Sequence, residues 1–190
     1  MKHLGTQTIT TERLILRKFT MDDAQAMYDN WASDHEVTKY LTKPRHESIE
    51  DTRTVLTDWL CKYEDDGYYQ WAIVFKEYGD EPVGNFVVAY KDDRIKMVHV
   101  GYCLGKRWWN MGITSEALQA VIDFFFREVK VNRIEARFDP RNPNSGKVMT
   151  RCGMVYEGTR READMSNLGL SDSVMYAILA SDYAPTCDDS

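Results

Sequence analysis

The sequence predicts an α+β domain built on a single mixed, largely antiparallel sheet that is flanked by about four helices. Three apolar runs at 68–76, 82–90 and 95–104 are separated only by short polar turns, which predicts an antiparallel meander. A long helical pattern then precedes a strand-like run at 133–138, and this order implies a crossover to a parallel neighbour. The repeated strand–helix units of a doubly wound nucleotide-binding sheet do not occur in this pattern.

The N-terminal third of the chain predicts one strand and two helices. Alternating apolar residues over 11–19 indicate the strand, and Thr20 supplies the N-cap of a helix that ends near residue 32. Ser48 and Asp51 have the spacing of a capping box, which predicts a second helix through about residue 64.

The C-terminal half begins with the longest predicted helix, over 111–129. Its apolar residues recur at the three-to-four spacing of one helix face, at Ile113, Ala117, Val121 and Phe125. A short helix over 142–152 is predicted to end at Gly153, because glycine favours the left-handed conformation that terminates helices. The last predicted strands are 154–161 and 173–180.

Length and composition predict one soluble domain over residues 1–183, with 184–190 as a flexible tail. The net charge of −6 argues against a nucleic-acid partner that is bound through its phosphates. The N-terminus has no signal-like apolar segment and no long apolar stretch follows, so we expect a cytoplasmic protein without membrane contact. The four cysteines are far apart in sequence, which predicts reduced thiols and no metal site.

One stretch, 98–117, combines a strand, a polar turn and the start of the long helix. The N-terminus of a helix leaves backbone N–H groups unpaired and carries a partial positive charge. Lys106, Arg107 and the small Gly112 would allow an anionic group to approach these N–H groups closely. The sequence therefore predicts a site for a phosphate-bearing cofactor.

Two sets of motifs resemble the GNAT superfamily of N-acetyltransferases, and more narrowly its RimJ/RimL-type branch. The first is WWNMGITSEA at 108–117; the second is Asn142-Pro-Asn-Ser145 followed by Cys152-Gly-x-x-x-Glu157-Gly158. The similarity extends over about 11–183. The resemblance implies acetyl-CoA as the acetyl donor, coenzyme A as the product, and for this branch an acceptor that is a protein N-terminal amine.

The resemblance also implies which residues contact the cofactor. Its pyrophosphate would be held by the turn and first helical residues, namely Arg107, Trp108, Trp109, Asn110, Met111, Gly112, Ile113 and Thr114. Its pantetheine arm would pair with the preceding strand at Val98, Val100 and Tyr102. Asn110 stands where relatives often have glycine, and asparagine tolerates left-handed backbone angles better than most residues.

Asn142 and Ser145 have two compatible interpretations. The resemblance implies that Asn142 holds the pantetheine amide and that the Ser145 hydroxyl protonates or hydrogen-bonds the departing thiolate. Both residue types also favour helix starts for local reasons, so simple capping is the alternative.

The general base is predicted less directly. Relatives commonly carry a glutamate two residues before the Gly-Tyr pair, where this chain has His99, and Glu157 is a second candidate. Deprotonation at pH 7 costs about 1 kcal/mol for an α-amine and about 4.6 kcal/mol for lysine. A neutral histidine would therefore suffice for an α-amine, although His99 could instead be a packing residue. Trp31 and Tyr40 are the predicted residues of an acceptor pocket.

The predicted activity is acetyl transfer from acetyl-CoA to a primary amine by direct attack on the thioester. The amine would belong to a protein N-terminus or to a small molecule, and the enzyme would be a monomer or a homodimer. A non-catalytic sensor of acyl-CoA and a nucleotide-binding protein are the alternatives that the sequence leaves open.

Overall fold

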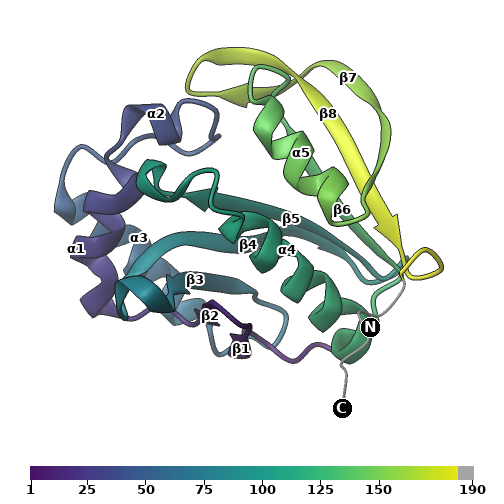
Figure 1. Cartoon of the computed structure of the whole chain (residues 1–190), viewed down its shortest axis with the longest axis horizontal. Coiled ribbons are helices and arrows are strands. Elements are labelled where there is room, and N and C mark those ends of the chain that lie inside the picture. Colours follow the sequence, from purple (N-terminus) through teal and green to yellow (C-terminus); the bar gives the residue numbers. More distant parts are fainter. Residues whose placement is uncertain (184–190) are drawn as a thin grey trace.

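The computed structural model describes residues 1–183 and shows one eight-stranded mixed sheet in the order β1-β2-β3-β4-β5-β6-β8-β7 (Figure 1). Every pair of neighbours is antiparallel except β5 and β6, which are parallel as the crossover predicted. The strands are β1 (Ile9–Thr10), β2 (Leu14–Arg17), β3 (Gln70–Phe75), β4 (Pro82–Asp92), β5 (Met97–Leu104), β6 (Arg133–Phe138), β7 (Val155–Ser166) and β8 (Gly169–Leu179). The predicted tail at 184–190 lies outside the described residues.

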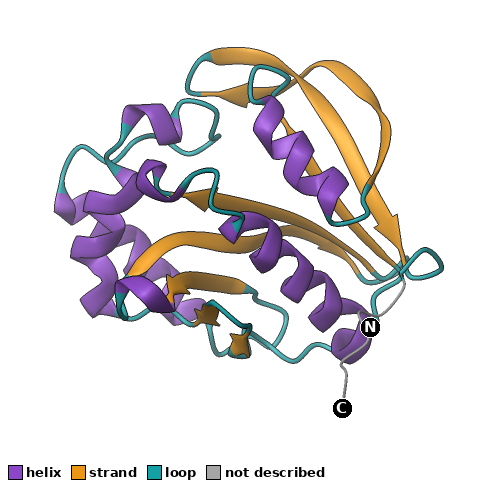
Figure 2. Ribbon diagram, in the orientation of Figure 1, coloured by secondary structure: helices purple, strands orange, loops and turns teal. Residues whose placement is uncertain are grey.

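Helices lie on both faces of the sheet (Figure 2). They are α1 (Ala24–Met27), α2 (His35–Thr38), α3 (Ile49–Lys62), α4 (Ile113–Phe124) and α5 (Pro143–Arg151). A wider helical turn extends α4 to Val129, so the predicted end of the helix over 111–129 is confirmed, while its start lies two residues later, at Ile113. The predicted helix over 20–32 is broken into a 3-10 turn, α1 and a wide turn.

Two hydrophobic clusters hold these layers together. The larger cluster packs α4 and α5 against one face of the sheet and includes Val98, Val100 and Ile134. The smaller cluster packs α1 and α3 against the opposite face, where Ala72 and Cys103 contribute. Because side chains alternate across a strand, successive residues of β5 face the two clusters in turn.

Local sequence signals placed the helix ends correctly. The Ser48 side chain accepts from the N–H of Asp51, whose carboxylate accepts from the N–H of Ser48, so the predicted capping box is present. Gly153 has φ of 78° after α5, which is the left-handed conformation expected there. The stretches β1 and α2 were not predicted, because two and four residues are too few for a periodicity to show.

The β7–β8 hairpin is longer than predicted and reaches α2 (Figure 1). Its turn is at Asn167, whose N–H donates to the carbonyl of Leu41 and whose side chain donates to the carbonyls of Thr38 and Lys43. The outer part of β7 is charged and exposed and contains a register shift between Arg160 and Asp164, so no apolar alternation marks it as a strand.

Within residues 1–183, no helix is long and apolar enough to cross a membrane. The same residues contain no cluster of histidine, cysteine and carboxylate side chains that could hold a metal ion.

Candidate active site

Strands β5 and β6 separate beyond their shared segment, and this divergence creates the centre of the candidate site (Figure 1). Their pairing begins at Met97 with Arg133 and ends at Val100 with Ala136. From Gly101 to Leu104, β5 continues to pair with β4 alone. The backbone edge that faces β6 is therefore free of strand pairing over 101–104. Apart from the Leu104 carbonyl, which accepts from the Trp109 indole, it offers N–H and C=O groups to an extended ligand.

This free edge lies further along the strand than the sequence predicted. The backbone of Val98 and Val100 is occupied by both neighbouring strands, and their side chains are buried in the larger cluster. Tyr102 lies on the free part of the strand. Of the three residues proposed for the pantetheine arm, only Tyr102 therefore has an open backbone edge.

The turn between β5 and α4 presents a run of unpaired N–H groups. In the described part of the chain, none of the N–H groups of residues 110–115 has a hydrogen-bond acceptor. Asn110 has φ of 63° and Gly112 has φ of 77°, so the left-handed conformation predicted for Asn110 is confirmed. Successive N–H groups in such a turn form a concave site for an anion, which the dipole of α4 reinforces.

An ion pair anchors this turn to β2. Arg13 donates to the Met111 carbonyl at 3.0 Å and to the Glu116 carboxylate at 2.7 Å, and Thr11 also donates to Glu116. Burial raises the pKa of Glu116, but the hydrogen bonds from Thr11 and Arg13 outweigh it and leave the pKa below its ordinary value. Glu116 thus stays ionised and paired, so the glutamate of the helix-start motif has a structural role.

The side chains of the turn differ in whether they are available to contact an anion. The Arg107 guanidinium lies 5.1 Å from the Tyr78 ring centroid and 5.5 Å from that of Trp108, and it makes no ion pair within residues 1–183. Trp108 is buried, while the Trp109 indole N–H donates to the Leu104 carbonyl at 2.8 Å. Arg107 is therefore available to meet a phosphate, and Lys106 beside it is also exposed and without an ion pair within residues 1–183.

The first turn of α5 lies beside the free edge of β5. The Tyr102 hydroxyl donates to the Ser145 carbonyl at 3.1 Å, which joins the strand to the helix. Asn142 Nδ2 lies 3.3 Å from Ser145 Oγ, and the Asn142 side chain does not cap the helix. Asn142 thus occupies the N-cap position that the local interpretation expects, but its side-chain amide makes no capping bond and is directed to Ser145.

His99 faces the side of the sheet opposite α4 and α5, as its alternation with Val98 and Val100 requires. Its side chain is 13% exposed, and its Nδ1 lies 3.7 Å from Oε2 of Glu135. Burial lowers the pKa of His99, the charge of Arg137 lowers it further, and Glu135 opposes both. The imidazole is therefore neutral at pH 7 and able to accept a proton.

Glu157 and Trp31 are placed differently from their predicted roles. Glu157 pairs with Arg133, the first residue of β6, away from the divergence of the strands. The hydrogen bond from Arg133 holds the pKa of Glu157 below its ordinary value, which makes it a weak base. Trp31 is 3% exposed and packs against Phe19 in the smaller cluster, so its surroundings are those of a core residue.

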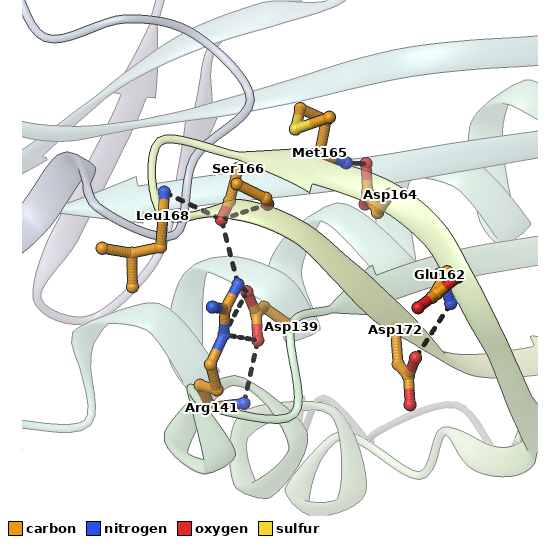
Figure 3. A network of polar contacts seen from close by, with 9 residues as sticks. Asp139, Arg141, Glu162, Asp164, Met165, Ser166, Leu168 and Asp172 are labelled. Carbon is orange, nitrogen blue, oxygen red and sulfur yellow. Dashed lines mark hydrogen bonds and ion pairs between the residues drawn. The ribbon is translucent and has the colours of Figure 1, made fainter.

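Tyr40 remains at the surface beside the β7–β8 hairpin, because the carbonyl of the next residue, Leu41, accepts from the N–H of Asn167. It is half-buried, with the Lys39 ammonium 5.2 Å from its ring centroid. Nearby, Arg141 donates to the buried Asp139 carboxylate at 2.6 Å and to Ser166 Oγ at 3.3 Å (Figure 3). This network fixes the segment before α5 to the hairpin.

Sequence analysis missed Arg13 and Glu135. Arg13 is 98 positions from its partner Met111, and no local pattern links them. Glu135 becomes a neighbour of His99 only through the parallel pairing of β5 and β6. A signal for Glu135 existed in the alternation of charged and apolar residues along β6, which places it on one face with Arg133 and Arg137.

Comparison with known proteins identifies the class. The model of the acetyltransferase (GNAT) domain matches residues 13–155, so the chain belongs to the GNAT family and is an acetyltransferase. An uncharacterized N-acetyltransferase p20 of Bacillus licheniformis is 32% identical over 94% of this chain and 99% of its own length. A ribosomal-protein-serine acetyltransferase of Escherichia coli is 30% identical over 69% of this chain and 72% of its own.

A solved structure gives the same fold. It is a ribosomal L7/L12 α-N-protein acetyltransferase in complex with coenzyme A, 22% identical, with a TM-score of 0.81 over 91% of this chain and 98% of that one. GNAT acetyltransferases take their acetyl group from acetyl-CoA, which is accordingly the cofactor of this chain. The unpaired N–H groups at 110–115 and the free strand edge at 101–104 fit a ligand with a pyrophosphate and an extended amide-bearing arm.

Proposed function

We propose that this chain transfers the acetyl group of acetyl-CoA to the α-amine at the N-terminus of a protein. The observation that carries the proposal is the juxtaposition of the unpaired N–H groups at 110–115, the free β5 edge and Ser145 at the start of α5. The cofactor supplies an activated acetyl thioester. The names of relatives that act on ribosomal proteins support a protein acceptor.

The donor side is formed by residues of β5, α4 and α5. The N–H groups of Asn110, Met111, Gly112, Ile113 and Thr114 would bind the pyrophosphate, with Arg107 adding a positive charge. Asn142 would orient the arm of the cofactor through its amide. Its contact with Ser145 Oγ keeps that hydroxyl in place, and the hydroxyl would donate a proton to the departing thiolate.

The acceptor side is formed by the opposite face of the sheet. His99 is the proposed base, because it is nearly buried, neutral and two residues from the start of the free edge. A neutral imidazole matches an α-amine, whose deprotonation at pH 7 costs only about 1 kcal/mol. Tyr40 is the proposed contact for the acceptor, whereas Trp31 and Glu157 are left out for the structural reasons given above.

The test is an acetylation assay with matched peptides. One peptide has a free N-terminal serine and no lysine, and its control has the same sequence with a formylated N-terminus and one added internal lysine. We expect mass spectrometry to show acetylation of the first peptide only. Modification of the lysine alone would contradict the proposal.

A binding measurement separates this function from the sensor interpretation. Tight calorimetric binding of acetyl-CoA without turnover on any peptide or small amine would favour a non-catalytic sensor over the proposed enzyme. Equal affinity for ATP and coenzyme A would instead favour nucleotide binding.

A further inference from the structure

His99 and Glu135 are direct neighbours in the only parallel strand pair of the described sheet. Because paired residues of adjacent strands project from the same face, both side chains lie on the face opposite α4 and α5. His99 Nδ1 is 3.7 Å from Glu135 Oε2, and the two side chains are 13% and 20% exposed. This separation is longer than a hydrogen bond, but within residues 1–183 Nδ1 has no closer hydrogen-bond partner, so the carboxylate is the expected acceptor for a proton on Nδ1.

The Glu135 carboxylate is itself held in place. Its Oε1 accepts from Arg133 Nε at 2.6 Å, while the remaining nitrogens of Arg133 pair with Glu157. Arg133 thus engages one oxygen of Glu135 and leaves Oε2 to face His99. The row Glu157–Arg133–Glu135–His99 joins residues of β7, β6 and β5, with β8 between β7 and β6. It gives Glu157 a structural role in place of the predicted catalytic one.

Other charged and titratable groups also surround the imidazole. On β6, Arg137 is two residues beyond Glu135 on the same face, and it pairs with Asp164 of β7 at 2.9 Å. On β4, Tyr90 is opposite His99 in the strand register. Arg137 disfavours the imidazolium, so the neutral state depends on burial and Arg137 while the orientation depends on Glu135.

We propose that Glu135 is a positioning residue that keeps the proton of the neutral His99 imidazole on Nδ1 and leaves Nε2 as the proton acceptor in acetyl transfer. The inference rests on the proposed function for its catalytic part. Nε2 takes one proton from the amine nitrogen as that nitrogen bonds to the acetyl carbon. The electron pair of the broken C–S bond leaves with the sulfur, and the imidazolium that forms lies beside the Glu135 carboxylate.

The tautomer can be measured in the free protein without any turnover. Long-range ¹⁵N–¹H correlations resolve the two ring nitrogens of each histidine, and His99→Gln identifies the His99 signal among the four histidines. We expect the wild-type chain to carry the proton on Nδ1 of His99. A wild-type proton on Nε2 would overturn the proposal, and this result needs no variant to fold.

Three variants separate the effects of Glu135 and Glu157 on the tautomer of His99. Glu135→Met removes the acceptor at similar volume, so the proton should redistribute toward Nε2. Glu135→Gln keeps an acceptor oxygen and should retain the wild-type tautomer. Glu157→Gln disturbs Arg133 without touching His99, and it should also leave the tautomer of His99 unchanged. An unchanged tautomer in Glu135→Met would overturn the proposal.

Kinetics test the catalytic part. Glu135→Met should lower kcat at least about tenfold with little change in the KM for acetyl-CoA, and Glu135→Gln should recover part of that loss. Loss of the carboxylate should also move the acidic limb of the rate–pH profile to lower pH, because Glu135 opposes the factors that lower the pKa of His99. The positioning role would be contradicted if Glu135→Met and Glu135→Gln impaired KM and kcat to the same extent and the acidic limb of the rate–pH profile did not move. Absence of turnover in the wild-type chain would instead refute the proposed function and leave the tautomer result standing.

Discussion

Ser145 lies in the first turn of α5 with both of its oxygens in contact with the site. Its hydroxyl faces the Asn142 amide, and its carbonyl accepts from the Tyr102 hydroxyl. Burial raises the pKa of Tyr102, so its hydroxyl stays protonated and remains a donor. These contacts fix the helix against the strand where the two proposed halves of the reaction meet.

Ser145→Ala is expected to lower kcat by about 10²-fold, because it removes the proposed proton donor to the thiolate. The affinity for acetyl-CoA should change little, since no backbone contact is lost. Steady-state release of coenzyme A, followed by chromatography, measures the first quantity, and calorimetry measures the second. Asn144→Ala, at an exposed position of the same helix turn, is the matched control. Unchanged turnover in Ser145→Ala would remove the assigned role.

Arg107→Gln is expected to weaken coenzyme A binding about tenfold, which corresponds to about 1.4 kcal/mol for a lost charge-assisted contact. The dependence of the affinity on salt concentration should also become weaker. Calorimetry at two ionic strengths measures both effects. Arg53→Gln on α3 is the charge-matched control, because Arg53 pairs with Glu50 on an exposed helix face. An equal loss in the two variants would show a general charge effect.

At the scale of elements, the start of α4 depends on two residues in the left-handed conformation. Asn110 and Gly112 turn the backbone so that several N–H groups face the same side. Arg13 then holds the turn from β2 through Met111 and Glu116. The candidate anion site is therefore a property of the strand, turn and helix together.

Gly112→Ala is expected to destabilise the chain by roughly 1–2 kcal/mol, because a Cβ at φ of 77° is strained. The added Cβ would lie 3.5 Å from Arg13 Nη2, which is an ordinary van der Waals contact, so the cost comes from the backbone angle. A turn that relaxes this angle should also lose affinity for coenzyme A. Asn110→Gly is the matched control, since glycine adopts the same angles without strain. Urea unfolding and calorimetry check the pair of variants. Equal stability of Gly112→Ala and the wild type would contradict the prediction.

The β7–β8 hairpin and α2 are joined by the side chain of Asn167, so these elements should move together. Asn167→Ala removes two hydrogen bonds to the carbonyls of Thr38 and Lys43, and we expect faster amide exchange in α2 and the hairpin turn. The KM for the peptide acceptor should rise several-fold while that for acetyl-CoA stays unchanged. Leu168→Ala, with an exposed side chain in the same turn, is the control. Equal exchange in both variants would show that Asn167 does not link the two elements.

At the scale of the whole molecule, the proposed function uses the sheet to separate the two substrates. The donor residues lie on the side of α4 and α5, whereas His99 lies on the opposite face. The divergence of β5 and β6 is the place where the two faces of the sheet are connected. The amine and the thioester can therefore approach from different faces without competing for the same surface.

Stability should fall as the pH drops below about 6.5, because burial lowers the pKa of both His46 and His99 in the folded chain. Near pH 6.5 the histidines of the unfolded chain take up protons that those of the folded chain do not. The unfolding free energy therefore keeps falling until the pH reaches the lowered pKa values of the folded chain. Each unit of difference between the folded and unfolded pKa of a histidine contributes about 1.4 kcal/mol to the unfolding free energy. The carboxylates with lowered pKa, such as Glu116, lose their contribution only at more acidic pH.

Urea unfolding at pH 8.0 and 5.5 measures this effect. The difference in unfolding free energy should shrink in His46→Gln and in His99→Gln, each of which removes one titrating group. His35→Gln, at an exposed position, is the control and should behave as the wild type. A stability that is independent of pH over this range would contradict the prediction.

The fold class and the cofactor turn were predictable because their signals are local. Apolar alternation predicted the meander, and Ser48 with Asp51 predicted the start of α3. The length of β7 and β8 escaped prediction, because their outer halves pair through backbone bonds between charged, exposed residues. The free edge was displaced from 98–102 to 101–104, because strand pairing depends on β6, which is distant in sequence.

The sequence by itself determined the meander, the start of α3, the end of α5 and the left-handed turn before α4, because capping, glycine conformation and periodicity act over a few residues. Only the tertiary structure decided which side chains share a site. It placed Trp31 in the core, committed Glu157 to Arg133 and brought Glu135 beside His99. Such pairings depend on strand register and burial across the whole sheet, and no local pattern in the chain encodes them.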